Sequence, residues 1–320
     1  MSTHSFVLGA VALLARKVVS GATILFAATT LIFFSLQLAP GNVIDALVGD
    51  AASDVSREAA TAEWGLDKPL HEQYANYLAR LAHGDLGRSY ILSQSVTKVI
   101  SDRIGPTLEL TLTAAVIAVA VAVTVIVLTG TGRPVIARIS SLLELILVST
   151  PGFWLGIVLM FIVSFQLGLL PVVGSNGFLT LLLPGATLGL KVAGELIQIM
   201  RGAIDRALEE PFALSAKARG ISDIGFSLRH GLRHAAIPAI TVAGWIVGSL
   251  LTGTFVVEQL FGRPGIGTLT VKAVLSRDMP VVMGVSLLAA AAYVGVSSIV
   301  DVLCTFIDPR LRHAPDFGKH

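Results

Sequence analysis

The stretch MRGAIDRALEEPFALSAKARGISDIGFSLRHGLRHAAIPA, from Met200 to Ala239, is a charged island between two apolar segments. The rest of the chain is strongly apolar. Of its 320 residues 54% are hydrophobic and 14% are charged, whereas about a quarter of the residues in soluble domains are charged. This composition predicts an all-α polytopic membrane protein, because helices satisfy their own backbone groups in lipid. The island is then the segment that a soluble partner can reach.

The gaps between charged residues locate the membrane spans, since a helix needs about 20 mostly apolar residues to cross the hydrocarbon core. Pro171 and the turn-like run 174–177 divide one long apolar stretch into two spans. The run after Arg16 and Lys17 is longer than a signal-peptide core, so we expect a retained helix. Six spans result: 18–39, 110–132, 145–167, 179–200, 235–257 and 279–300.

The distribution of Lys and Arg predicts the orientation of the chain. With a cytoplasmic N-terminus, thirteen of these residues lie inside and nine outside, and most of the nine fall in one long loop that the charge rule does not govern. Both termini are therefore expected in the cytoplasm. The expected parts are an N-terminus with the first span (1–39), an extracytoplasmic loop (40–105), a five-helix core (106–309) with a coupling region at 201–234, and a cytoplasmic tail (310–320).

The long outer loop is patterned rather than of low complexity. A helical stretch is expected at 56–64, and an amphipathic run follows, with apolar or aromatic side chains every three or four residues: Tyr74, Tyr77, Leu78 and Leu81. Two interpretations stay open, a packed cap and a docking surface for a soluble protein. Under the second, the candidate contacts are Asp85 and Arg88 in this loop and Arg263 in the last outer loop.

The segment 256–269, VVEQLFGRPGIGTL, lies between the fifth and sixth spans and is too apolar for a plain solvent loop. We expect it to dip back toward the membrane, where protein or a water-filled cavity must satisfy its backbone. Glu258 and Phe261 are therefore candidates for lining a translocation path.

The fourth span carries two charges, Lys191 and Glu195. Charges at membrane depth are costly and usually face a cavity or one another. Their i,i+4 spacing leaves two interpretations open: a self-neutralising pair, or contact with charged cargo or a partner subunit. The same span contains Gly185 and Gly189, at a spacing that lets two helices approach closely.

Within the island, Pro211 interrupts the helix that leaves the fourth span, and residues 212–220 can form a short helix that ends at Gly220. A short helix with a face of small residues and flanking cations suits a groove in a soluble domain.

The island sequence Ala216-Lys217-Ala218-Arg219-Gly220, followed eighteen residues later by Pro238, resembles the cytoplasmic coupling motif of bacterial ABC importer permeases. Further pieces along nearly the whole chain are similar, in the right order, to the first of the two permease subunits of the dipeptide, oligopeptide and nickel importer family. These pieces are GLDKPL at 65, GDLGRS at 84, PTLEL at 106, STPGFWLG at 149, LPGATL at 183, LRHAAIP at 232, VVEQLFGRPGIG at 256, RDMPVV at 277 and VDVLCTFIDPRLR at 300.

This resemblance implies a multi-pass permease of the bacterial inner membrane that imports peptides or related small solutes, or else nickel or a metallophore. The implied partners are a homologous second permease, two cytoplasmic ATPases, an extracytoplasmic solute-binding protein and membrane lipid. The implied ATPase-coupling residues are Phe212, Leu214, Ser215, Ala216, Lys217, Ala218, Arg219 and Gly220. The family's usual Glu-Ala-Ala triplet is replaced here by the residues 214–216.

Other function classes find less support in the residues. The sequence has no GxxxxGK[ST] phosphate loop, so ATP and Mg²⁺ are expected on the partners and no cofactor on this chain. It also lacks the HExxH and GxSxG motifs of hydrolases, so no catalytic residue is expected. His230 and His234 have zinc-ligand spacing but alternate with arginines, which predicts no metal site, and nothing indicates nucleic acid. An ATP-independent channel or secondary transporter is the alternative class, but it would show two related halves.

Overall fold

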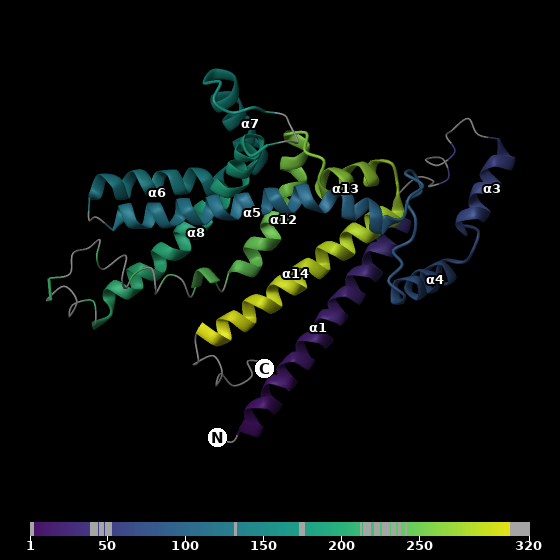
Figure 1. The fold of residues 1–320 in the computed structure, drawn as a ribbon, viewed down its shortest axis with the longest axis horizontal. Coiled ribbons are helices and arrows are strands. Elements are labelled where there is room, and N and C mark those ends of the chain that lie inside the picture. Colours follow the sequence, from purple (N-terminus) through teal and green to yellow (C-terminus); the bar gives the residue numbers. More distant parts are fainter. Residues whose placement is uncertain are drawn as a thin grey trace. The chain divides into compact units, whose positions relative to one another are not determined.

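The computed structural model describes residues 3–38, 44, 48, 53–130, 133–172, 177–211, 213, 219–220, 225, 231, 235, 238–240 and 242–307. Over these residues the regular secondary structure is helical, with one isolated bridge between Arg88 and Ser95 (Figure 1). The chain divides into two compact units. Unit 1 comprises Met1–Gly105 and Gly265–Val294, and unit 2 comprises Pro106–Pro264 and Gly295–His320.

Unit 1 is built from α1 (Thr3–Leu38), α3 (Asp54–Trp64), α4 (Leu70–Ala82), α13 (Ile266–Leu275), the start of α5 (Val96–Thr129) and most of the apolar part of α14 (Met279–Ile307). The Ser53 hydroxyl caps the first turn of α3 by accepting from the amide of Ser56. Gly65 ends α3 with φ +66°, a conformation that glycine adopts without steric cost. The helical stretch expected at 56–64 is therefore confirmed.

The amphipathic run of α4 packs on α1. Tyr77 is buried and stacks on Phe33 with ring centroids 6.3 Å apart, and both pack with Met283 of α14. The Tyr74 hydroxyl and the Thr30 hydroxyl share a hydrogen bond of 2.6 Å. The periodicity of aromatic side chains thus predicted the buried face of α4 correctly.

Unit 2 is built from the rest of α5, α6 (Pro134–Ser149), α7 (Gly152–Leu159), the π-helix η1 (Met160–Gln166), α8 (Leu179–Glu209) and α12 (Ala243–Leu260). α8 packs against α6, α7 and α12. In its most apolar window 67% of the residues are buried, against 17–28% in the other single spans. α8 is therefore the central helix of unit 2, and the other spans leave much apolar surface for lipid or a partner.

The described helices include four that are each long and apolar enough to cross a membrane: Lys17–Leu38, Val96–Thr129, Leu179–Glu209 and Met279–Val300. A fifth span is possible if Pro134–Ser149 and Gly152–Gln166 are counted together, although they meet at 115°. Part of the expected fifth span, 235–257, lies outside the described residues, and α12 is described from Ala243 onward. The count of six spans stays a prediction.

The expected third span, 145–167, differs from the structure, because the helix is broken at Thr150 and Pro151. Thr150 is extended, with φ −85° and ψ 130°, as expected for a residue whose α conformation would clash with the following proline ring. Pro151 also has no amide hydrogen to continue the α6 ladder. The apolar composition of 145–167 was correctly identified, but the direction of the chain changes within it.

Candidate functional site

The break between α6 and α7 lies beside the two charges of α8. Lys191 Nζ donates to the carbonyl oxygen of Thr150 at 3.4 Å, at the residue where α6 ends. The aliphatic stem of Lys191 passes Gly152, where an added Cβ would lie 3.7 Å from Lys191 Cδ. Lys191 therefore satisfies a helix-terminal carbonyl of the broken span, the kind of group that otherwise lacks an intrahelical partner.

Glu195 is placed differently. Its Oε2 atom is buried and has no hydrogen-bond partner among the described residues. Within the same described part of the chain, no ion pair joins Glu195 to Lys191 within 4.0 Å. The structure thus brings a cation and an anion to one face of α8 without pairing them, and each retains capacity for a further charged group.

A second polar contact joins α6 to α8, and sequence reasoning missed it. Arg201 Nη2 donates to Glu144 Oε1 and, at 2.6 Å, to Ser140 Oγ. Arg201 Nη1 donates to Ser141 Oγ at 2.9 Å, and Ser140 Oγ donates to Glu144 Oε1 at 2.8 Å. Glu144 and Ser140 are buried. Their i,i+4 spacing within a mostly apolar helix was the signal that would have marked this face of α6.

The two predicted path residues, Glu258 and Phe261, lie at the C-terminal end of α12 and are buried. Glu258 is hydrogen-bonded to α5 near Pro106, where α5 enters unit 2. Glu258 is 0% exposed and accepts a 2.6 Å hydrogen bond from Thr107 Oγ1, and Phe261 is also buried. Arg263 is 2% exposed, and its Nη2 lies 3.5 Å from Glu109 Oε2. Arg263, the predicted docking contact of the last outer loop, is thus almost fully buried, and its backbone amide donates to the carbonyl oxygen of Glu258 at 2.9 Å.

The segment 256–269 is helical on both sides of a short turn, since α12 ends at Leu260 and α13 begins at Ile266. Gly262 in this turn has φ +63°. The backbone of the apolar segment is thus largely satisfied within helices, which is what a segment at membrane depth requires.

The coupling region is described only at its edges. Phe212, Leu214, Ser215, Ala216, Lys217 and Ala218 lie outside the described residues. α8 ends at Glu209, and Glu210 is extended with ψ 146° just before Pro211, as predicted. Arg219 and Gly220 are exposed, and Gly220 has φ +78°, the left-handed conformation that commonly follows a helix end.

Asp85 and Arg88, the predicted docking contacts of the outer loop, are exposed, and their side chains form hydrogen bonds with backbone groups of the same loop. Asp85 Oδ1 accepts from the amide of Gly87 at 2.8 Å, and Arg88 Nε donates to the carbonyl of Ser93 at 2.9 Å. Both residues come from one surface loop of unit 1, whereas Arg263 belongs to unit 2.

Asp278, which the sequence did not mark as a site residue, stabilises the same loop through hydrogen bonds. Asp278 is buried, accepts from the Ser89 hydroxyl, and accepts from the amide of Tyr90 at 3.1 Å. A carboxylate that collects several donors holds its loop firmly, because charge-assisted hydrogen bonds are stronger than neutral ones.

Comparison with known proteins decides the family. Residues 122–313 match the family described as binding-protein-dependent transport system inner membrane component, and residues 10–111 match its N-terminal component. The chain belongs to this permease family. Its members are the non-catalytic membrane subunits of ABC importers, so this chain is an ABC importer permease.

Individual relatives support the same assignment over almost the whole chain. A putative peptide transport system permease protein of Brucella abortus (strain 2308) is 33% identical over 311 residues, which are 94% of this chain and 99% of that protein. The glutathione transport system permease protein GsiC of Escherichia coli (strain K12) is 34% identical over 290 residues, or 90% and 95% of the two chains.

Membership confirms several expectations at once. A permease of a binding-protein-dependent system works with a solute-binding protein and with ATPase subunits, and it is a multi-pass protein of the inner membrane. The apolar helices of the described residues agree with that location. The ATP-independent channel is not favoured.

Proposed function

We propose that this permease is the first membrane subunit of an importer for peptides or related small solutes, paired with a homologous second permease and served by two ATPases. The observation that carries the proposal is the match over nearly the whole chain to permeases named for peptide and glutathione transport. Six spans, cytoplasmic termini and the domain limits predicted from the sequence belong to the same proposal.

The unpaired charges of α8 favour a zwitterionic cargo over a bare metal ion. Lys191 would repel a divalent cation, and the described residues include no cluster of three or more His, Cys, Asp or Glu side chains that suits a metal. A peptide offers an ammonium and a carboxylate, which complement Glu195 and Lys191. Nickel or a metallophore is the second candidate, supported only by the family resemblance.

The proposed path runs along the broken span. Helix breaks at membrane depth are tolerated where they line a protein cavity, and discontinuous helices commonly form the substrate sites of transporters. In unit 2 the break at Thr150 lies beside Lys191, and Glu258 and Phe261 supply further path positions.

Replacing Lys191 and Glu195 tests the cargo contact. We expect Lys191→Gln and Glu195→Gln each to lower kcat/KM for peptide uptake about 10- to 100-fold, because a hydrogen bond to a charged group contributes about 1.5–3 kcal/mol. Uptake of labelled peptides by the reconstituted importer is the measurement. Glu58→Gln, an exposed carboxylate of α3 outside the proposed path and coupling region, is the matched control. Unchanged uptake of all solutes by a normally assembled Lys191→Ala, Glu195→Ala variant would refute the contact.

Coupling to the ATPases is proposed for residues 212–220. In the proposed alternating-access cycle, closure of the ATPases moves the segment that follows α8, and the spans open first outward and then inward. The short distance along the chain from Arg201 to Pro211 supports this, because α8 is anchored to α6 at Arg201 and continues to Glu209.

Gly220 offers the sharpest test of coupling. A β-branched residue is disfavoured at φ +78°, so we expect Gly220→Val to leave membrane insertion intact while ATP-dependent uptake falls at least tenfold relative to ATP hydrolysis. Gly220→Asn is the matched control, since asparagine tolerates the left-handed conformation. The ratio of solute imported to ATP hydrolysed in proteoliposomes is the readout. An unchanged ratio in the valine variant would remove Gly220 from the coupling role.

A further inference from the structure

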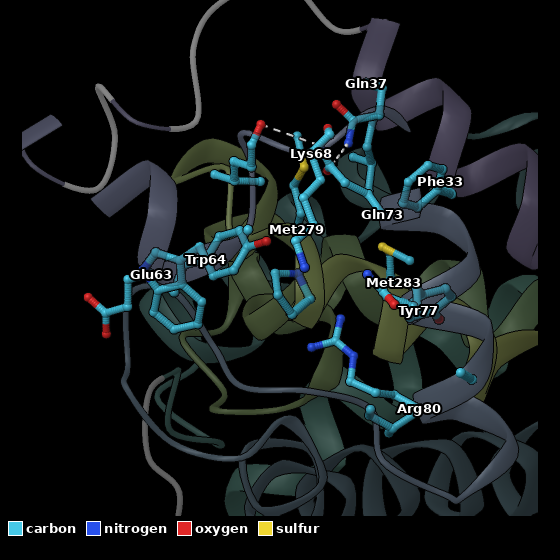
Figure 2. Close-up of a pocket in the computed structure, with 18 of the residues that line it drawn as sticks. Phe33, Gln37, Glu63, Trp64, Lys68, Gln73, Tyr77, Arg80, Met279 and Met283 are labelled. Atoms are coloured by element: carbon cyan, nitrogen blue, oxygen red, sulfur yellow. Dashed lines mark hydrogen bonds between the residues drawn. The ribbon is translucent and has the colours of Figure 1, made fainter. Parts of the chain in front are cut away.

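A cavity of about 510 Å³ lies within unit 1, between the ends of α1, α3, α4 and α14 and the loop at Tyr90 (Figure 2). Its volume is in the range of about 300–1,000 Å³ that is usual for small-ligand sites. All of its lining residues belong to unit 1, and the proposed function uses none of them.

One wall of the cavity is aromatic and thioether-rich. Trp64 packs against Tyr90 with ring centroids 4.7 Å apart, and Met279 and Met283 of α14 line the same space. Such a wall offers a large apolar contact area at low conformational cost.

The polar part of the cavity carries two cations, Lys68 from the segment between α3 and α4, and Arg80 from α4. Figure 2 shows both side chains extending into the hollow, whereas the carboxylate of Glu63 points away from it. Glu63 is the one acidic residue of the lining, and no ion pair engages Lys68 or Arg80 among the described residues. The cavity is therefore positive as well as apolar.

The surrounding framework holds these groups in place. Gln73 Nε2 donates to the backbone carbonyl of Lys68 at 2.8 Å. Burial raises the pKa of the Tyr77 and Tyr90 hydroxyls, and the charge of Arg80 opposes that rise at both. Arg80 thus acts on two tyrosines of the same lining.

We propose that this cavity binds a carboxylate carried on an apolar body, with the carboxylate between Lys68 and Arg80 and the apolar part against Trp64 and Met279. A guanidinium binds a carboxylate through two parallel hydrogen bonds, and a neighbouring ammonium adds charge without geometric demand. The peptide terminus of a cargo and an acidic side chain of the solute-binding protein both carry this chemistry.

Trp64 serves as the reporter in the test. The chain has three tryptophans, and Trp154 and Trp245 are 53% and 54% exposed, so both tolerate replacement by phenylalanine. The full-length single-tryptophan chain in nanodiscs is titrated with N-acetylphenylalanine and with its neutral isostere, N-acetylphenylalaninamide. We expect saturable change of Trp64 emission with the acid, and at least tenfold weaker binding of the amide.

Charge variants locate the carboxylate. We expect Arg80→Gln and Lys68→Gln each to raise Kd for the acid about tenfold, and Lys98→Gln, an exposed cation outside the cavity, to leave it unchanged. Two cavity variants are used so that the test still decides if one of them misfolds. Equal binding of acid and amide, or unchanged affinity in both cavity variants, overturns the proposal.

Competition identifies the source of the carboxylate. Displacement of the acid by a free tripeptide but not by its C-terminal amide indicates cargo, and displacement by the purified solute-binding protein indicates an acidic side chain of that protein. If neither competes, the proposal fails. The assignment of the carboxylate to one source rests on the proposed function, whereas binding of the acid does not. Loss of ATP-dependent uptake would therefore count against the proposed function, and absence of the Trp64 response would count against the cavity proposal.

Discussion

Arg201→Ala is expected to lower the free energy of unfolding of the permease by about 3 kcal/mol and to abolish most uptake. The reason is the buried carboxylate of Glu144, which would lose the guanidinium that neutralises it. Removing one partner of a buried ion pair leaves an uncompensated charge, and such changes cost about 3–5 kcal/mol. Thermal unfolding of the purified importer, followed by size-exclusion chromatography, measures the change.

Two further variants separate the ion pair from a general effect of altering α8. Arg206→Ala removes an exposed cation from the same helix and should be nearly neutral. Replacing the whole pair, as Glu144→Gln with Arg201→Met, should recover much of the loss, because apolar or neutral groups of similar volume often substitute for a buried pair. Equal stability of Arg201→Ala and Arg206→Ala would show that the contact contributes nothing.

Gly189→Val should be the most damaging substitution in the helix packing of unit 2. A Cβ at Gly189 would lie 2.7 Å from the backbone oxygen of Ala114 and 3.0 Å from Ile117 Cβ. Backbone cannot move aside as a flexible side chain can, so α5 and α8 would have to separate. Overpacking of this kind costs about 1–3 kcal/mol, and a β-branched residue adds to it. The loss should appear as a lower unfolding temperature and a smaller yield of assembled importer.

Gly295→Ala provides the contrasting substitution, since a Cβ there meets nothing within 4 Å. It should be neutral or stabilising by up to about 1 kcal/mol, because alanine favours the helix more than glycine does. Gly189→Ala should lie between the two, with a loss of at least about 1 kcal/mol. A Gly189→Ala variant as stable as Gly295→Ala would mean that α5 and α8 do not approach closely.

The central helix α8 organises unit 2 through its contacts with three neighbouring segments. Its face of small residues admits α5, its Arg201 joins α6, and its Lys191 reaches the carbonyl at the break of the third span. In the proposed coupling, movement of residues 212–220 would reach the membrane along this helix.

The local predictions depended on patterns within a few residues of one another. The helix at 56–64, the buried face of α4 with Tyr77, and the end of α8 before Pro211 were predicted correctly, since capping residues, aromatic periodicity and proline act locally. The apolar span predicted at 145–167 contains a helix break at Thr150 and Pro151 that hydropathy could not locate, because hydropathy reports composition and not the direction of the chain.

The sequence by itself determined that this protein is an apolar, helical ABC importer permease, because span length, charge distribution and ordered motifs are properties of the chain. Only the tertiary structure decided what each charge meets. It directed Lys191 to the carbonyl oxygen of Thr150, paired Arg201 with Glu144, buried Arg263 beside Glu109 and placed Lys68 and Arg80 around one cavity. The energy of a charge depends on its burial and on partners that are distant in sequence, and folding alone brings these together.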